Sequence, residues 1–395
     1  MNFITVKKAK EIIEKEIFKT VENKISLKDS LHYYTAQNIY APLDVPNFDN
    51  SAMDGYAFSY KDYEECKKIK VSYTIQAGDS NIPSLRSGEA VRIFTGAPIP
   101  HGADTVIMQE KISLKNDYLI FNDSQIKKGQ NIRLRGSQSK KGDLLISSNT
   151  KITAGVLGFL AGFGFTHLYV NTYPKIGIIV TGNELTEVGN PLEFGQIYET
   201  NSWALQAALQ ELNILPTILI KVKDNNELTL QAIKKAWEKA DILLITGGIS
   251  VGDYDFVQEA LENLGTKKLF YKIQQKPGKP MYFGKKENQF VFALPGNPAS
   301  VLTCFYQYVQ PFIEGIKGRK NFYEEKYLGA LSSDFEKNNN LTLFLKAYEK
   351  DGNVKILSAQ ESYKLDSFSK SNCIAEIDGG PRILKQGEKI SLWKI

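Results

Sequence analysis

The sequence predicts a multidomain α/β protein that contains a doubly wound parallel sheet and two regions rich in β-strands. Three observations support this prediction. At 395 residues the chain is too long for one ordinary hydrophobic core. Between residues 174 and 320, apolar runs alternate with helical patterns, which is typical of a parallel sheet covered by helices. On either side of that region, short alternating runs between glycine turns predict strands.

The composition excludes several classes of protein. The net charge of +5 is small and the lysines are scattered, so we expect no nucleic-acid partner. No apolar run approaches the roughly eighteen residues of a membrane span, and the first residues lack a secretory pattern, so we expect a cytoplasmic protein without a membrane segment. Three dispersed cysteines and three histidines argue against disulfides and zinc, and favour a hard, oxygen-bound metal if one is present.

The first part of the chain predicts a helix and then a β-rich region. Apolar residues recur at helical spacing over residues 6–23, which indicates an amphipathic helix. Residues 46–144 predict strands. There Asp54 precedes an apolar run and Thr95 lies at the mouth of a proline-stiffened loop, although a surface linker or an ordinary turn explains both equally well. Residues 153–164 are small and apolar, and predict a close-packed helix.

The parallel sheet is expected at residues 174–320. Strands are predicted at residues 176–181, 216–222 and 242–245, with helices at 201–213 and 227–239 between them. Ligands of such sheets bind beyond the carboxyl ends of the strands. Two of these ends carry Thr-Gly, at Thr181 and Thr246, so Glu184 and the Asp253/Asp255 pair are expected to converge on one rim.

The turn after residue 245 is the first candidate site. Gly247 and Gly248 would let backbone N–H groups approach an anion, and Asp253 and Asp255 follow at a spacing that can hold a divalent cation. A simple strand-to-helix turn is the plainest alternative. The same letters, Gly248-Ile-Ser-Val-Gly252, also match the nucleophile elbow of serine hydrolases. That alternative fails because all three histidines precede Ser250, whereas such triads run Ser, acid, His.

Two later loops should reach the same rim. Lys276 and Lys279 lie on a proline-stiffened turn, where two ammonium groups repel each other unless an anion lies between them. Further on, Asn297 suits a helix N-cap and Pro298 the first helical position, so the amides of Ala299 and Ser300 are expected to be free for an oxyanion. The alternative is a well-capped helix beside a basic turn. After about residue 320, strand-like runs predict a small C-terminal β-domain.

Together these motifs resemble the MoeA family, the molybdopterin molybdenumtransferases, over essentially the whole chain. The motifs are Ser51-Ala-Met-Asp-Gly-Tyr56, Thr95-Gly-Ala-Pro98, Thr181-Gly182 with Glu184, Gly247-Gly-Ile-Ser-Val-Gly252 with Asp255, Lys276-Pro-Gly-Lys-Pro280 and Leu294-Pro-Gly-Asn-Pro298. The resemblance implies a homodimer whose clefts combine the inserted domain of one subunit with the α/β and C-terminal domains of the other. It also implies four domains per chain: a discontinuous helical and linker domain (1–45 and 145–173), an inserted β-rich domain (46–144), an α/β molybdopterin-binding domain (174–320) and a C-terminal β-barrel (321–395).

The reaction implied by the resemblance is insertion of molybdate into molybdopterin-AMP, which a molybdopterin adenylyltransferase would supply, with Mg2+ and release of AMP. The resemblance places one group of residues around the substrate and Mg2+, with Glu184 and Asp255 as metal ligands: Asp54, Thr95, Glu184, Asp224 and Asp255. It places a second group near the adenylate phosphate: Gly247, Gly248 and Ser250. It places a third group at molybdate: Lys276, Lys279, Ser300 and Ser371. Pro295, Pro298 and Lys346 are expected to bind substrate as well.

The chain departs from the family pattern at two places. Ser137 and Gln138 stand where two carboxylates are common, and Lys346 stands where an arginine is usual, which keeps the charge but loses the bidentate fork. An active enzyme is the prediction, because the loop lysines and Asp255 are retained. The alternative is a catalytically weak paralogue that binds or delivers the pterin.

Overall fold

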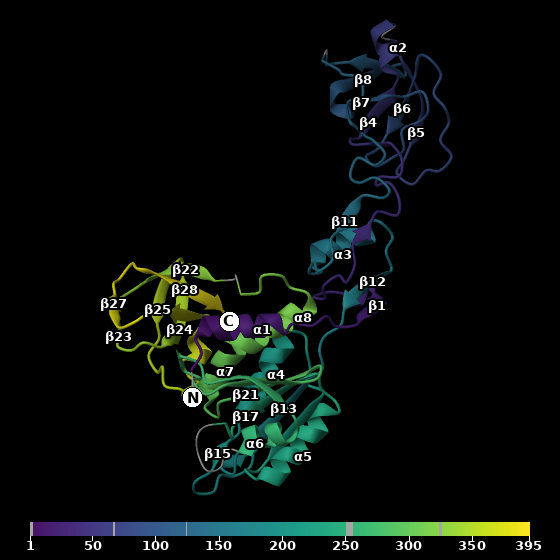
Figure 1. Cartoon of the computed structure of the whole chain (residues 1–395). Coiled ribbons are helices and arrows are strands. Elements are labelled where there is room, and N and C mark those ends of the chain that lie inside the picture. The colour runs from purple at the N-terminus through teal and green to yellow at the C-terminus, as the bar shows by residue number, and fades with distance from the viewer. Residues whose placement is uncertain (1–2, 66–67, 124, 250–255, 324–325) are drawn as a thin grey trace.

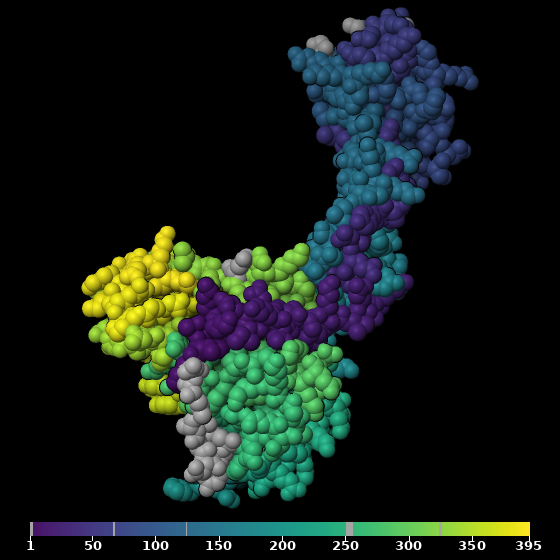
Figure 2. Space-filling model, in the orientation of Figure 1, coloured from purple at the N-terminus to yellow at the C-terminus, as the bar shows by residue number. Residues whose placement is uncertain are grey.

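A computed structural model of the chain describes residues 3–65, 68–123, 125–249, 256–323 and 326–395. The molecule is elongated (Figure 1). A β-rich distal domain lies at the end of a narrow arm, and the arm joins a body made of the α/β domain and a C-terminal barrel. The space-filling view in Figure 2 shows that the distal domain is separated from the body along the whole length of this arm.

The α/β domain is built on a six-stranded sheet with the order β16-β13-β17-β21-β20-β18. Its strands are β13 (Ile176–Thr181), β16 (Ile218–Val222), β17 (Ile242–Thr246), β18 (Lys267–Tyr271), β20 (Tyr282–Lys286) and β21 (Gln289–Leu294). The first four strands in this order are parallel, as predicted, but β20 runs antiparallel to both of its neighbours, β21 and β18. The edge is mixed because a two-residue connection joins β20 to β21, and a connection that short can only make a hairpin.

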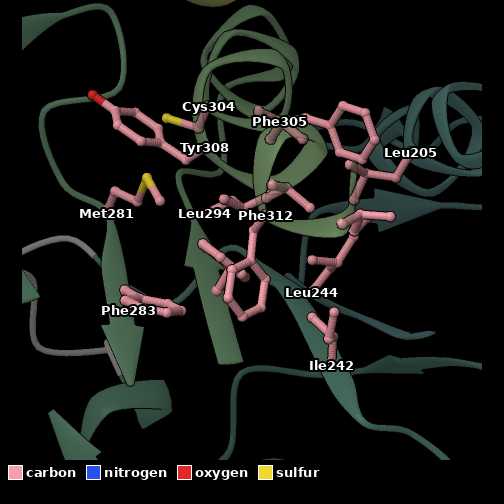
Figure 3. Close-up of a cluster of buried hydrophobic side chains, with 14 of the residues drawn as sticks. Leu205, Ile242, Leu244, Met281, Phe283, Leu294, Cys304, Phe305, Tyr308 and Phe312 are labelled. Carbon is pink, nitrogen blue, oxygen red and sulfur yellow. The ribbon is translucent and has the colours of Figure 1, made fainter. Parts of the chain in front are cut away.

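Helices cover both faces of this sheet. Alternate strand residues point to opposite sides, so Ile178 and Leu244 belong to one apolar cluster whereas Ile179 and Ile245 belong to the other. Figure 3 shows part of the first cluster, to which the sheet contributes Leu244 and one of the helices contributes Phe312. The helices on this first face are α1 (Val6–Lys15), α4 (Asn201–Glu211), α7 (Pro298–Cys304) and α8 (Gln310–Lys317). Those on the second face are α5 (Asn226–Trp237) and α6 (Phe256–Asn263).

Two predicted helices differ from the structure. Helix α1 ends at Lys15 rather than near residue 23, because residues 22–26 form strand β1 (Glu22–Ser26), which pairs with β12 (His167–Asn171). The side chain of Val21, counted in the helical pattern, is 79% exposed. The helix predicted to begin at Pro298 contains a π-helical turn, Phe305–Val309, between α7 and α8.

The arm contains paired strands and one helix. β2 (Ile39–Tyr40) pairs with β11 (Leu144–Ile146) beside helix α3 (Ala154–Ala161). Thr153 caps α3 by accepting a hydrogen bond from the amide of Val156 at 3.3 Å. The predicted helix is confirmed, but its small residues are not closely packed within this chain, because Ala154, Gly155, Gly158 and Ala161 are exposed.

The distal domain confirms the predicted β-rich region. Its six-stranded sheet has the order β7-β4-β6-β5-β9-β8, with an apolar cluster on each face. These strands are β4 (Gly55–Phe58), β5 (Lys70–Ile75), β6 (Glu89–Ile93), β7 (Thr105–Met108), β8 (Ile112–Lys115) and β9 (Tyr118–Phe121). Helix α2 (Tyr60–Glu65) follows β4, and a short pair formed by β3 (Asn50–Ser51) and β10 (Ile132–Arg133) lies at the junction with the arm.

The C-terminal region is a closed five-stranded barrel. Its strands are β22 (Tyr327–Leu331), β24 (Thr342–Lys350), β25 (Asn353–Ile356), β26 (Cys373–Ile377) and β28 (Lys389–Lys394). The barrel closes because β24 pairs with both β25 and β26. A separate ribbon of β23 (Phe335–Lys337) and β27 (Arg382–Leu384) covers one end. Strand β19 (Gln275–Lys276) pairs with β24 and so connects the α/β domain to the barrel.

Candidate active site

A pocket of about 730 Å³ lies beyond the carboxyl ends of the parallel strands. Thr181 ends β13, Pro295 follows β21, and Asp224 follows β16 by two residues. The pocket lies where ligands of doubly wound sheets bind. Of the predicted site residues, those that line it are Glu184, Asp224, Gly247, Gly248, Pro295 and Pro298.

The glycine turn after β17 requires glycine at both positions. Gly247 and Gly248 have φ angles of +87° and +60°, which L side chains rarely adopt. A Cβ atom on Gly247 would lie 2.5 Å from the backbone oxygen of Thr181, and one on Gly248 would lie 2.9 Å from Val257 Cγ2. The two glycines therefore let the end of β17 pack directly against the end of β13, and their backbone faces the pocket.

The acidic wall of the pocket is held by a reciprocal contact between two strand ends. The amide of Asn183 donates to Asp224 Oδ2 at 3.3 Å, and the amide of Asp224 donates to Asn183 Oδ1 at 3.2 Å. This pair fixes Asp224 beside exposed Glu184. The carboxylate oxygens of both residues are donors that suit a hard cation such as Mg2+.

Ser250, Asp253 and Asp255 lie outside the described residues, so their predicted roles stay predictions. Among the residues that are described, no group of three or more His, Cys, Asp or Glu side chains is close enough to hold a metal ion. The metal-binding set predicted here therefore depends on Asp255 in addition to Glu184.

Several residues of the pocket were not predicted from the sequence. Buried Glu199 accepts a hydrogen bond from the amide of Ser202 at 2.7 Å and lies 3.6 Å from Lys221 Nζ. Asn201 donates through its side chain to the carbonyl of Gly296 at 2.8 Å, which joins α4 to the loop after β21. Tyr363 comes from the C-terminal region, more than sixty residues beyond that loop, so no local pattern could have assigned it to the pocket.

Of the two candidate lysines, Lys276 lies at the end of β19 and Lys279 lies on the turn that follows. Both side chains are exposed, and Lys279 Nζ lies 4.7 Å from the centre of the Phe3 ring. Pro280 of the same turn lines the pocket, so the turn lies at its edge. Because β19 pairs with barrel strand β24, this edge is also the boundary between the two domains.

The expected oxyanion site at the start of α7 is wrong. The amide of Ala299 donates to the carbonyl of Ser362 at 3.0 Å, and the amide of Ser300 donates to the carbonyl of Asn297 at 3.0 Å. Asn297 does not cap the helix with its side chain, which instead donates to Ser362 Oγ at 2.8 Å. The barrel loop around Ser362 therefore occupies the helix start that the sequence left free. Ser300 itself is buried.

Lys346 and Ser371 lie together in the barrel. Lys346, on β24, is fully buried, and its Nζ has no hydrogen-bond partner among the residues that the structure describes. Burial lowers the pKa of Lys346 to about 8, although Glu361 and Asp366 oppose this shift. Its ammonium group lies 5.9 Å from the centre of the Phe368 ring, and Ser371 Oγ donates to the Phe368 carbonyl at 3.0 Å.

Asp54 and Thr95 meet in the distal domain. The amide and the hydroxyl of Thr95 both donate to Asp54 Oδ1, at 2.8 and 2.7 Å. These hydrogen bonds hold the pKa of the Asp54 carboxyl below its usual range. The pair lies across the arm from the pocket, so one chain does not bring these two residues to the other candidates (Figure 2).

Comparisons with known proteins agree with this architecture. Residues 4–164 match the family described as "MoeA N-terminal region (domain I and II)", and residues 177–315 match the "Probable molybdopterin binding domain". The chain is 35% identical to a molybdopterin molybdenumtransferase of Haemophilus influenzae, over 97% of this chain and 96% of that protein. It is 32% identical to one of Staphylococcus aureus, over 93% and 90% of the two chains.

A solved structure covers the whole fold as well. The molybdopterin biosynthesis MoeA protein of Pyrococcus horikoshii superimposes with a TM-score of 0.85 at 27% identity, over 100% of both chains. The two family matches, the full-length relatives and the shared overall fold lead to one conclusion. The chain belongs to the MoeA family of molybdopterin molybdenumtransferases.

Proposed function

We propose that the protein inserts molybdate into molybdopterin-AMP, releases AMP and forms molybdenum cofactor. The observation that carries this proposal is the 730 Å³ pocket, in which a two-glycine turn and three acidic residues, Glu184, Glu199 and Asp224, lie beyond the parallel strands of a MoeA-type fold. Such a pocket offers backbone to a phosphate and carboxylates to its metal ion, and it is large enough for a nucleotide-sized ligand.

In this proposal the pterin nucleotide lies in the pocket. Gly247 and Gly248 approach the adenylate phosphate, with Ser250 nearby, while Pro295 and Pro298 line the pocket from the loop after the neighbouring strand β21. Glu184, Asp224 and Asp255 would hold Mg2+ together with the phosphate. When bound, Mg2+ would neutralise phosphate charge and so make AMP a better leaving group. The protein residues then bind and orient the substrate, and no covalent protein nucleophile is needed.

Molybdate would bind at the edge of the pocket between the α/β domain and the barrel. Lys276 supplies charge from the end of β19 and Lys279 from the turn that follows. Lys346 supplies a buried ammonium group from β24, which has no hydrogen-bond partner in the part of the chain that the structure describes. A tetrahedral dianion suits such a set of cations. Ser300 and Ser371 would contribute their hydroxyl groups, since the Ser300 amide already donates to Asn297.

We further infer that the protein acts as a homodimer, in which Asp54 and Thr95 of one subunit complete the pocket of the other. Two observations support this arrangement. The Asp54–Thr95 pair lies on a domain that the arm separates from its own pocket. Helix α3 of the arm leaves small and apolar residues exposed, which suits close packing against a second copy. A monomeric mass in solution would contradict this inference.

The proposed reaction also sets the place of the protein in a sequence of reactions. Its substrate carries an adenylyl group, so a molybdopterin adenylyltransferase must act before it, and we place both enzymes in the cytoplasm. Among the described residues, no helix combines the length and apolarity needed to cross a membrane.

A second candidate function is a paralogue that binds or delivers the pterin without turnover. The observation that favours it is the pair Ser137 and Gln138, which stands where the family commonly has two carboxylates. Their amides hold the junction between arm and distal domain, since Ser137 donates to the Leu134 carbonyl and Gln138 to the Val45 carbonyl, both at 3.0 Å. These contacts use the backbone, and the two side chains lie outside the pocket lining.

The decisive experiment measures AMP release from molybdopterin-AMP by the purified protein with Mg2+, with and without molybdate. We expect release that depends on molybdate and that is lost in Asp255→Asn. Glu238→Gln, at the exposed end of α5, is the matched control and should retain activity. Binding of the pterin without AMP release at any molybdate concentration would favour the paralogue instead.

A further inference from the structure

The turn that carries Lys276 and Lys279 is held from beneath by one buried side chain, Gln275. Its exposed fraction is 0%, although it is the residue immediately before the first lysine. Gln275 Nε2 donates to the carbonyls of Pro277 and Gly278, at 3.1 Å in each case. One amide group therefore donates to two consecutive peptide carbonyls between the two lysines.

The other end of the Gln275 amide is held by Tyr308. The Tyr308 hydroxyl donates to Gln275 Oε1 from the π-helical turn between α7 and α8. Tyr308 is fully buried, and burial raises its pKa, so the hydroxyl keeps the proton that it donates. Figure 3 shows Tyr308 beside Cys304 at the edge of the apolar cluster, with its hydroxyl pointing out of the cluster.

The turn fits closely against the helix below it. Gly278 has a φ angle of +80°, and a Cβ atom there would lie 2.5 Å from Cys304 Sγ. On the other side, the amide of Thr342 donates to the Gln274 carbonyl at 3.0 Å, and the amide of Ile273 donates to the Lys279 carbonyl at 2.9 Å. The backbone of the turn is thus fixed on both sides, and Gln275 adds a contact made by a polar side chain of the turn itself.

We propose that Gln275 and Tyr308 are positioning residues for molybdate, which act by fixing the backbone from which Lys276 and Lys279 extend. This inference rests on the proposed function of the two lysines. Two ammonium groups on one short turn repel each other, so a mobile turn would let them move apart before the anion binds. A turn held in place keeps the two ammonium groups close together, so molybdate binding does not have to supply the free energy needed to bring them together.

The location of Gln275 and Tyr308, which together form a brace for the turn, determines which ligand their loss should affect. Gln275 and Tyr308 lie below the turn and outside the lining of the 730 Å³ pocket, whereas the pterin nucleotide would contact the glycine turn, Pro295 and Pro298. Loss of the brace should therefore weaken binding of molybdate and leave binding of the pterin nucleotide unchanged. A residue with a purely structural role would lower stability without this selectivity.

The test compares Gln275→Met, Tyr308→Phe and the double variant in two assays. The first assay measures KM for molybdate and for molybdopterin-AMP during AMP release, and the second measures molybdate affinity directly by calorimetry. Each single variant should raise KM and Kd for molybdate about tenfold, as expected for lost hydrogen bonds to buried groups, with KM for the pterin changed less than about twofold. The double variant should add little, because the two residues act as one unit.

Gln289→Met is the matched control. Gln289 Nε2 also donates to two carbonyls, those of Trp237 at 2.6 Å and Ala240 at 2.9 Å, but Gln289 begins β21 at the end of the sheet opposite the pocket. This variant should lower Tm to a similar extent without changing molybdate affinity. The inference is overturned if Gln275→Met raises KM and Kd for molybdate no more than Gln289→Met does, or if it raises KM for the pterin equally.

The two assays separate this inference from the proposed function. If the wild-type protein binds molybdate but releases no AMP, the proposed function fails and the Kd values still decide the role of Gln275. If the wild-type protein turns over normally and Gln275→Met is unaffected, the inference alone fails. If the wild-type protein neither binds molybdate nor releases AMP, both are overturned.

Discussion

The Tyr34 hydroxyl donates a hydrogen bond to the Glu314 carboxylate, 3.1 Å away, and this contact joins the arm to helix α8 of the body. The same carboxylate accepts a hydrogen bond from Lys317 Nζ at 2.8 Å, and both charged residues are buried. Lys317 Nζ also lies 4.6 Å from the centre of the Tyr173 ring, which stacks on Tyr33 of the arm. The angle between arm and body is thus set by buried, directional contacts.

Replacing Glu314 by Gln should destabilise the protein by about 3 kcal/mol, because a buried ammonium group would lose its partner charge. Burial lowers the pKa of Lys317 while Glu314 raises it, so in Glu314→Gln the pKa falls further. The loss of stability should therefore be largest at acidic pH, where the lysine must stay charged. Urea denaturation at pH 6 and pH 9 measures both effects.

The control for this variant is Glu65→Gln on α2. Glu65 forms an exposed pair with Lys61 at 3.7 Å, and such pairs contribute little to stability. This variant should unfold at the same urea concentration as the wild type. If Glu314→Gln also unfolded at the same urea concentration as the wild type, the buried contacts between the arm and α8 would not hold the arm in place.

Mixing two inactive variants tests the composite site. Asp54→Ala removes the distal carboxylate and Glu184→Ala removes the pocket carboxylate, and each homodimer should release no AMP. If the two residues act across the dimer, each mixed dimer has one intact site, and a fully exchanged equal mixture should recover about a quarter of wild-type activity. Each variant refolded alone is the control. No recovery in mixtures shown to contain mixed dimers would mean that Asp54 serves its own chain.

Gly247→Ala should disrupt the pocket. The new methyl group would lie 2.5 Å from the Thr181 backbone oxygen, and φ of +87° disfavours any L side chain. Gly189→Ala is the control, because Gly189 has a φ angle of +100° but no atom within 4 Å of the added group. The control should lose about 1 kcal/mol of stability and keep its pterin affinity. Gly247→Ala should lose more than that, and its pterin binding should fall at least tenfold in calorimetry.

The residues that could be recognised from the sequence are those whose signal is local. Strand ends followed by glycine, such as Thr246-Gly247-Gly248, are defined by adjacent residues, so the rim of the pocket was predictable, including Gly247 and Gly248 of its lining. Helix α1 ends early because β1 pairs with β12, about 145 residues away, and no helical periodicity reports such a pairing. The hydrogen bond from the Ala299 amide to the Ser362 carbonyl could not be predicted either, because Ser362 is distant in the sequence.

The burial of Lys346 could not be predicted from the sequence either, because it depends on how the barrel strands close around β24. Its consequence is a pH dependence that can be measured. With a pKa of about 8, Lys346 loses its charge as the pH rises above 8, so the attraction for a dianion weakens. From pH 7 to pH 9, KM for molybdate should rise about tenfold.

As the pH rises and molybdate binding weakens, the free energy of unfolding should increase over part of the same pH range. The unfolded chain keeps the Lys346 proton up to the ordinary pKa of 10.5, whereas the folded protein releases it near pH 8, so stability should increase between these values. Lys346→Arg keeps its charge throughout, and should abolish both the rise in KM and the gain in stability at alkaline pH. Steady-state AMP release and urea denaturation from pH 7 to pH 10 measure the two quantities. If KM for molybdate rises equally in the wild type and in Lys346→Arg, another group titrates and Lys346 does not bind the anion.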